Sequence, residues 1–269
     1  MDVSSLFQLN IGLDQSRMLA LFLAFLPFFF FANWMVKRGT PLALRPIAGF
    51  ATLKGLLGRA AEAGQPVHLS LGTAGIGDEF TADTTAALYV LEYLAERGAI
   101  SGTPPIVTCA NPTAFPVAQD VMRRAYRNQG MAEEYNPLQT RFIAPDPWLY
   151  TQPQKDSTAY AVGIMRMLNQ QKLAANVMIG RFGDEFLLMG ETGAQKHLTQ
   201  IGGTSDARTL PFVHATMDQP LIGEEIYAGG AYLSDKPTHL GSLLAQDLMR
   251  WGIVGGIVAA ILLRAMGWI

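Results

Sequence analysis

The chain has 269 residues, of which only 16% are charged, and its formal net charge is -2 at pH 7. This balance, without a dense cluster of Lys and Arg, argues against a nucleic-acid partner. The single cysteine, Cys109, excludes an intrachain disulfide and is compatible with a reducing compartment. Once the two apolar ends are set aside, roughly 190 residues remain, enough for one α/β domain with its own core.

Residues 1–38 are predicted to form an N-terminal transmembrane anchor. Met18–Val36 is an uncharged apolar run of 19 residues, which is long enough to cross the hydrocarbon core of a bilayer. Arg17 flanks it on one side and Lys37 on the other. The run is longer than the apolar part of a signal peptide, and no small-residue cleavage site precedes Lys37, so we expect the anchor to be retained.

Residues 39–66 are predicted to be a juxtamembrane linker followed by a short helix. Gly39–Phe50 contains two prolines and two glycines, which favour irregular structure, and the predicted helix is Ala51–Ala63. An alternating apolar run then begins at Val67, and it opens a predicted α/β domain that extends over residues 67–236.

Strands and helices are predicted to alternate through this domain. The predicted strands are Val67–Thr73, Pro105–Ala110, Thr140–Ala144, Asn176–Gly180 and His197–Ile201, the last ended by Gly202-Gly203. The predicted helices are Asp78–Arg97 with Gly98 as its C-cap, residues 112–128, Ser157–Gln171, one that begins at Gly183-Asp184, and Glu224–Leu233. Phe212–Met217 is either a sixth strand or the end of a helix begun near Asp206. The alternation predicts the α/β class, with a Rossmann-like, mostly parallel sheet of five to six strands.

Residues 237–269 are predicted to be an amphipathic stretch that continues into a second transmembrane helix, Trp251–Ile269. Gly252 and Gly256 form a GxxxG pair that Ala260 continues, and small residues at this spacing let another helix approach closely. The partner is either the first span of the same chain or a span of a neighbouring protomer.

The basic residues predict how the two spans are oriented. Most of those near the spans lie on the side of the middle domain, at Lys37, Arg38, Arg45, Lys236 and Arg250. Beyond the spans there are only Arg17 and Arg264. The positive-inside rule therefore predicts a two-pass membrane protein whose α/β domain is cytoplasmic and whose two termini are outside.

The strand tips are the expected place for a ligand, because ligands of open parallel sheets bind beyond the carboxyl ends of the strands. The first tip, VHLSLGTAGIG at Val67–Gly77, carries three glycines, which let backbone N–H groups approach a phosphate at a helix N-terminus. The candidate ligand-binding residues at the tips are Gly72, Thr73, Gly75, Gly77, Asn111, Arg181 and Gly183.

Three features argue against a nucleotide at the first tip. The glycines follow a GxxGxG order, whereas dinucleotide-binding loops have GxGxxG. Asn111 follows the second strand where a ribose-binding Asp or Glu would stand. Asp78 and Glu79, directly after the loop, would repel a phosphate. A tight turn from strand to helix needs glycine without any ligand, and we favour that interpretation.

Arg181 has two interpretations. At a strand tip it could bind an anionic ligand bidentately. It could instead form an ion pair with Asp184, Glu185 or Asp146 across the rim of the sheet, and we favour this second role because arginines at loop starts usually play it.

No catalytic residue and no metal site is predicted. The four histidines, His68, His197, His214 and His239, lack the spacing of metal ligands. His68 and His214 fall inside predicted strands, where a hydrogen-bonded core histidine is expected. Neither a nucleophile elbow nor a reactive setting for Cys109 is found, and the sequence requires no cofactor.

Four long segments carry a resemblance to a known family. They are HLSLGTAGIG (68–77), TPPIVTCANPTAFPVAQDVMRRAY (103–126), AANVMIGRFGDEFLLMGE (174–191) and DQPLIGEEIYAGGAYL (218–233). Together they resemble an uncharacterised family of bacterial membrane proteins, a domain of unknown function that belongs mainly to green non-sulfur bacteria and their relatives. The resemblance covers about Ala51–Asp247. It implies a membrane-anchored α/β domain at the bacterial inner membrane, and it brings no activity or site residue.

Two functional interpretations follow. The favoured one is a binding or scaffold protein at the cytoplasmic membrane face, whose partners are the lipid bilayer, other copies of the chain in a homo-oligomer, and other membrane proteins. The rival is a membrane-tethered enzyme or sensor that binds a nucleotide-like or other anionic ligand at the Gly72–Gly77 loop. A transporter is disfavoured, because two spans enclose no path and carry no inward-facing acid or base.

Overall fold

The computed structural model describes residues 13–38, 44–143, 158–234 and 237–266. The chain divides into two compact units. The α/β unit is Arg45–Ser234, and the terminal unit combines Met1–Leu44 with Asp235–Ile269. The helix expected between linker and domain thus belongs to the α/β unit, where it begins at Ala48 and buries Phe50, Leu53 and Leu56.

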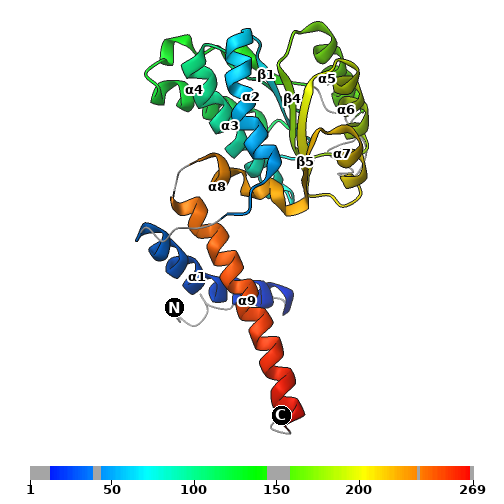
Figure 1. The fold of residues 1–269 in the computed structure, drawn as a ribbon. Helices are drawn as coiled ribbons and strands as arrows, with labels where there is room; N and C mark the ends of the chain where they lie inside the picture. The colour runs from blue at the N-terminus through cyan, green and yellow to red at the C-terminus, as the bar shows by residue number, and fades with distance from the viewer. Residues whose placement is uncertain (1–12, 39–43, 144–157, 235–236, 267–269) are drawn as a thin grey trace, which may run out of the picture. The chain divides into compact units, whose positions relative to one another are not determined.

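The α/β unit is built on a single sheet whose neighbouring strands are all parallel (Figure 1). Its strands are β1 (Val67–Gly72), β2 (Ile106–Cys109), β3 (Thr140–Phe142), β4 (Ala175–Arg181), β5 (Thr199–Thr204) and β6 (Gln219–Ile222). The six-stranded parallel sheet confirms the predicted class. The order β3-β2-β1-β4-β5-β6 is that of doubly wound sheets that bind dinucleotides.

Helices cover both faces of this sheet, as Figure 1 shows. One layer consists of α2 (Ala48–Ala63), α3 (Thr81–Ser101), α4 (Ala114–Asn128) and α8 (Gly229–Leu233). The other consists of α5 (Thr158–Gln170), α6 (Glu185–Gln195) and α7 (Leu210–Thr216). Short 3-10 helices are η2 (Ala132–Glu134), η3 (Pro137–Gln139) and η5 (Gly223–Ala228).

Apolar and polar residues alternate along β1, so that each kind lies on one face of the strand. Val67, Leu69 and Leu71 are buried on one face, and the polar residues His68 and Ser70 are buried on the other. Because helices cover both faces, these polar side chains have no access to water and need hydrogen-bond partners inside the protein.

The C-terminal end of the sheet differs from the prediction. Of the two alternatives for Phe212–Met217, the end of a helix is confirmed, because it lies on α7, which begins at Leu210 and ends at Thr216. The sixth strand is β6, which was not predicted. β5 also continues through Gly202 and Gly203 where the sequence suggested an end. Both glycines are needed inside the sheet, because a Cβ atom at Gly203 would overlap the backbone of β6 and one at Gly202 would lie 2.8 Å from the carbonyl oxygen of Met178.

The end of α3 also differs. Gly98 is not the C-cap, since α3 continues to Ser101 and the left-handed cap is Gly102, with φ of 68°. Gly98 instead allows close packing, because a Cβ atom there would lie 2.9 Å from Pro105. The expected end of the third strand at Ala144, and the first residue of the helix predicted at Ser157, lie outside the described residues.

The terminal unit contains two long helices, α1 (Leu13–Lys37) and α9 (Pro237–Ala265). Their apolar segments, Ser16–Lys37 and Thr238–Ala265, have 22 and 28 residues and are long and apolar enough to cross a membrane. Almost none of either segment is buried, in contrast to the core helices of soluble domains.

α1 packs against α9 through small residues. Gly241 faces Asn33, Gly252 faces Phe28, and Ala245 is fully buried. Of the predicted packing residues, Gly252 therefore contacts α1. Gly256 has no described atom near its Cβ position, and Ala260 is exposed, so α1 does not cover this part of α9.

Candidate functional site

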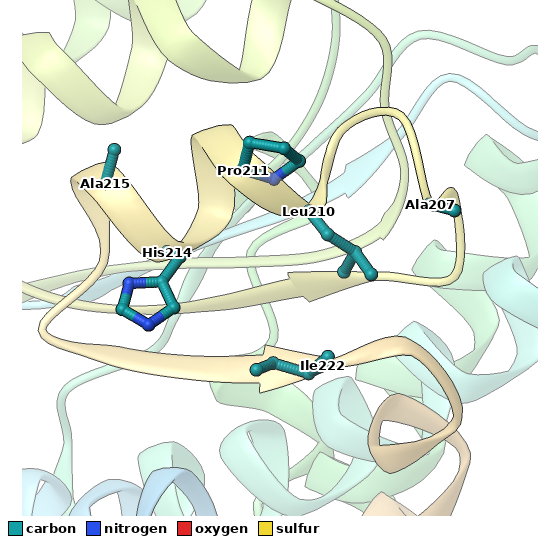
Figure 2. Close-up of a pocket in the computed structure, with 6 residues that line it drawn as sticks. All are labelled: Ala207, Leu210, Pro211, His214, Ala215 and Ile222. Carbon is teal, nitrogen blue, oxygen red and sulfur yellow. The ribbon is translucent and has the colours of Figure 1, made fainter.

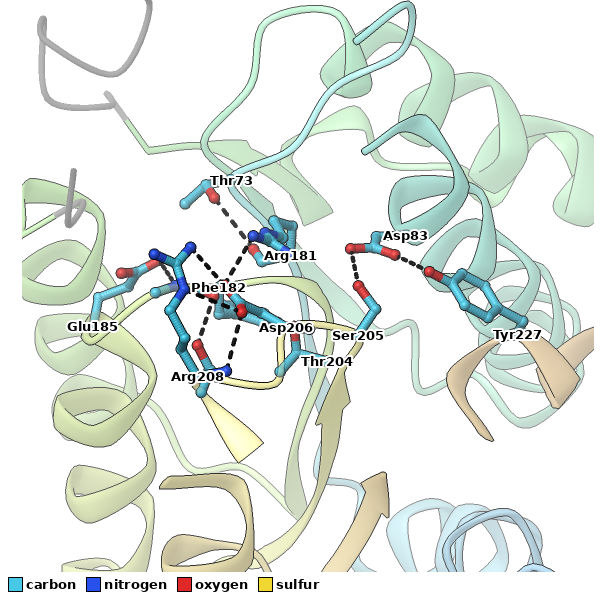
Figure 3. Close-up of polar contacts among 12 residues, drawn as sticks. Thr73, Asp83, Arg181, Phe182, Glu185, Thr204, Ser205, Asp206, Arg208 and Tyr227 are labelled. Atoms are coloured by element: carbon cyan, nitrogen blue, oxygen red, sulfur yellow. Dashed lines mark hydrogen bonds and ion pairs between the residues drawn. The ribbon is translucent and has the colours of Figure 1, made fainter. Parts of the chain in front are cut away.

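The candidate site is the region beyond the carboxyl ends of β1, β4 and β5, which we call the crevice because ligands of doubly wound sheets bind in a crevice at this place. From β1 the chain winds towards β2 and β3, and from β4 it winds towards β5 and β6. The ends of β1 and β4 therefore flank the point where the winding reverses, which is where doubly wound sheets bind ligands. Figure 3 shows the polar residues gathered there.

The glycine loop after β1 lies at this crevice, but the N–H groups of Gly75, Ile76 and Gly77 already have partners. The N–H of Gly75 donates to Asp78 Oδ2 at 2.7 Å, and that of Gly77 donates to Thr81 Oγ1 at 2.9 Å. The N–H of Ile76 donates to Thr113 Oγ1 at 2.8 Å. A phosphate bound by the loop would have to displace these side chains.

Asp78 is the main obstacle to such a ligand. Its other carboxylate oxygen accepts from the N–H of Phe80 at 2.9 Å, directly before α3. A carboxylate that bridges the loop and the start of a helix has the position and charge that a bound phosphate would have. Asp78 would therefore do more than repel a phosphate. Its carboxylate already occupies the place where the phosphate would accept hydrogen bonds from the loop, which we call the anion position.

The loop glycines have a packing reason that needs no ligand. A Cβ atom at Gly75 would overlap Thr113 and Asn111 of the loop before α4. Asn111 itself accepts from the backbone and the hydroxyl of Thr113, at 3.0 and 2.8 Å, and donates to the carbonyl oxygen of Thr73 at 3.5 Å. Asn111 therefore joins two loops, and its polar atoms are used within the protein.

A bulge between β1 and β4 explains two further glycines. The register between these strands shifts by one residue between Ser70 and Gly72. Gly72 and Gly180 have φ values of 78° and 144°, and a Cβ atom at either would overlap the backbone of the opposite strand. Thr73 then continues the contact, donating its N–H to the carbonyl oxygen of Arg181 at 2.9 Å.

Arg181, at the end of β4, forms an ion pair in the crevice. Its Nη2 lies 2.8 Å from Asp206 Oδ2, and its guanidinium lies 4.0 Å from the centre of the Phe80 ring. Arg181 thus forms an ion pair, as favoured from the sequence, but its partner is Asp206, which is not one of the three expected residues. Of the three expected partners, Asp146 lies outside the described residues, and Glu185 accepts instead from the N–H of Gly183 at 2.9 Å.

The charge state of Asp206 follows from its neighbours. Burial acts to raise the pKa of Asp206, but hydrogen bonds from Arg208 and the positive charges of Arg181 and Arg208 outweigh it and hold the pKa below its ordinary value. Asp206 is therefore ionised at neutral pH and neutralises Arg181. An anionic ligand that bound Arg181 would have to compete with the carboxylate of Asp206.

A second carboxylate, Asp83, was missed by the sequence analysis. It is only 2% exposed, in the first turn of α3. Ser205 Oγ donates to it at 2.7 Å, and the hydroxyl of Tyr227 donates to its other oxygen (Figure 3). Burial and the bond to Asp83 raise the pKa of Tyr227, which keeps its hydroxyl protonated as a donor. Only the tertiary structure brings these three elements together.

A polar ladder crosses the sheet below the crevice. His68 Nδ1 lies 2.7 Å from Asn176 Oδ1, and His68 Nε2 lies 2.9 Å from Thr108 Oγ1. Asn176 Nδ2 donates to Gln200 Oε1 at 3.0 Å. The prediction of a hydrogen-bonded core histidine is confirmed for His68. It is wrong for His214, which is exposed on α7.

An apolar pocket of about 590 Å³ lies between α7 and β6 (Figure 2). Its lining residues are Ala207, Leu210, Pro211, His214, Ala215 and Ile222. The imidazole of His214 is the one titratable group in this lining, so the pocket has no set of charges suited to a phosphate. Within the described part of the chain, no group of three His, Cys, Asp or Glu residues could hold a metal ion.

Comparison with known proteins identifies a family. The model of the Domain of unknown function (DUF6754) matches residues 8–269, which include both terminal helices. No curated protein and no solved structure is detectably similar to the chain. Because the match extends over nearly the whole sequence, the chain belongs to the family of the Domain of unknown function (DUF6754).

Proposed function

We propose that the protein is a membrane-anchored binding or scaffold protein that works as a homo-oligomer at the cytoplasmic face of a bacterial inner membrane. The observation that carries this proposal is the occupied crevice. Asp78 takes the anion position of the glycine loop, and Asp206 neutralises Arg181. A domain whose ligand-binding positions hold its own carboxylates is better suited to binding a partner than to nucleotide turnover.

The ends of the α/β unit support anchoring at one membrane face. Its first residue, Arg45, accepts a hydrogen bond at its carbonyl oxygen from the hydroxyl of Tyr232, close to its last residue, Ser234. The two connections to the terminal helices therefore leave the α/β unit side by side. This suits two spans that enter the bilayer from the same face, which would place both termini on the other side.

The outer part of α9 supports assembly. Gly256 and Ala260 are not covered by α1 and form a small-residue face on an apolar helix. Small residues let helices from separate chains pack closely in a bilayer, where lipid provides no hydrophobic driving force for association. The partner on this face would be a second copy of the chain or another membrane protein.

Native mass spectrometry of the full-length protein, purified gently in detergent, tests the proposal. The expected result is a defined homo-oligomer without additional small-molecule mass. Replacing Gly256 by Leu should reduce the number of protomers, whereas Gly55→Leu, on an open position of α2, should leave it unchanged. A monomer that carries a nucleotide-sized mass would contradict the proposal.

A second candidate function is supported by the position of Arg181. An arginine at the point where the winding reverses is where an anion-binding enzyme or sensor would place one. In that case ATP should raise the thermal unfolding midpoint of the full-length protein, and Arg181→Met should abolish the shift. The scaffold proposal predicts no shift in either protein.

A further inference from the structure

We infer that Gly223–Leu233, which we call the strap, couples the membrane connections of the α/β unit to the crevice. The strap consists of η5 and α8 and directly precedes the connection to α9. Glu225 of η5 binds Arg45 at the start of the α/β unit, and Tyr227 of the same helix binds Asp83. A shift of the membrane connections would thus be transmitted to the crevice through a six-residue 3-10 helix.

The membrane end of the strap is held by Arg45. Its Nη2 lies 3.0 Å from Glu225 Oε1, and the other oxygen of Glu225 accepts from the N–H of Ile222 at 3.0 Å. Tyr232 donates to the Arg45 carbonyl oxygen and stacks on Phe50 of α2, with ring centres 5.7 Å apart. Arg45 is therefore bound by residues from both η5 and α8.

The crevice end is held by Tyr227, two residues after Glu225. Its hydroxyl donates to Asp83, which also accepts from Ser205 at 2.7 Å. The residue after Ser205 is Asp206, the ion-pair partner of Arg181. A displacement of Tyr227 would therefore leave the buried carboxylate of Asp83 with one donor fewer and loosen the loop that holds Arg181.

The backbone of the strap suits a movable element. Gly223 opens it with φ of 58° and no described atom near its Cβ position. Gly229 joins η5 to α8, where a Cβ atom would lie 3.1 Å from Val90 and 3.5 Å from Phe50. The strap thus turns at glycine at its start and packs closely at its middle.

Hydrogen exchange in the full-length protein in detergent tests the coupling from the membrane end. The side chain of Arg45 is 82% exposed, so Arg45→Gln removes the ion pair with little loss of packing. We expect amide exchange at residues 204–208 and 80–84 to accelerate by up to about fivefold, the effect of losing one exposed ion pair. The matched control is Arg124→Gln, which breaks a half-exposed ion pair on α4.

The reverse experiment uses Tyr227→Phe, because coupling between two sites is reciprocal. Losing a hydrogen bond to a carboxylate should accelerate exchange at residues 45–50 and 229–233 by roughly tenfold. Tyr135→Phe is the control, since it removes a hydroxyl bound to the Gln119 carbonyl oxygen far from the strap in sequence. Changes confined to the contacts of each mutated residue would overturn the proposal, as would equal acceleration throughout β4 and α5.

Discussion

At the scale of single residues, His68 shows how a buried polar group is made compatible with a closed core. Asn176 presents its oxygen to Nδ1, because its amide nitrogen donates to Gln200. Nδ1 is therefore the protonated ring nitrogen, and Nε2 accepts from the hydroxyl of Thr108. The imidazole is neutral, fully buried and hydrogen-bonded at both nitrogens.

This arrangement predicts that stability falls in acid. Burial lowers the pKa of His68 from 6.5 to about 4; the charge of Arg141 acts in the same direction, and the hydrogen bond that Nδ1 donates to Asn176 acts against it. Between pH 6.5 and pH 4, His68 binds a proton in the unfolded chain but not in the folded protein. The contribution of neutral His68 to the free energy of unfolding is therefore fully present above pH 6.5 and is lost as the pH falls to about 4. The loss amounts to roughly 3 kcal/mol, to be followed as the thermal unfolding midpoint between pH 7 and pH 4.

Two variants separate this effect from general acid unfolding. His68→Gln lacks the titrating ring, so its midpoint should be lower at pH 7 but should vary less between pH 6.5 and pH 4. His214→Gln, at an exposed position on α7, should keep the dependence of the wild type. An unchanged slope in His68→Gln would show that other groups cause the loss.

At the scale of elements, the local patterns predicted β1 and the glycine turn well, but the last strand poorly. β1 has an apolar alternation that a short window reveals, whereas β6 contains Pro220 and has only four residues. β6 forms because Leu221 packs into the core beside β5 and α2. This contact is between distant parts of the chain, so the local sequence pattern does not predict it.

The same limit applies to the candidate site. Arg181 was found because a strand tip is a local feature of the sequence. Its partner Asp206 follows β5, whose end was misplaced, and Asp83 has its partners more than a hundred residues away, at Ser205 and Tyr227. Residue positions at strand tips could therefore be predicted, and the pairing between them could not.

The contact between α1 and α9 predicts how glycine substitutions on α9 change the stability of the helix pair. A Cβ atom at Gly241 would overlap the side chain of Asn33, so Gly241→Ala should destabilise the helix pair by about 1–3 kcal/mol. Gly256→Ala meets no described atom and should be neutral or slightly stabilising, because alanine favours the helix. Titration with SDS in mixed micelles, followed by circular dichroism, measures both; equal effects would place the contact elsewhere.

At the scale of the whole molecule, the family match includes both terminal helices as well as the α/β unit. The helices are therefore part of the domain that the family shares. Two helices long enough to span, joined to a unit whose ends lie together, suit the proposed topology, with the α/β unit on one face and both termini on the other. In this proposal the positive-inside rule, applied to the basic residues beside the spans, favours the cytoplasm for the α/β unit.

Cysteine labelling of intact bacterial cells tests this topology, because the native cysteine does not interfere. Cys109 is fully buried, and burial raises the pKa of its thiol to about 12, so it does not react with maleimide at neutral pH. A membrane-impermeant maleimide should label Ser5→Cys in intact cells. It should label Ala63→Cys, at the exposed end of α2, only after permeabilisation. Labelling in the opposite pattern would place the α/β unit outside and remove the cytoplasmic part of the proposal, while the occupied crevice would still argue for binding rather than turnover.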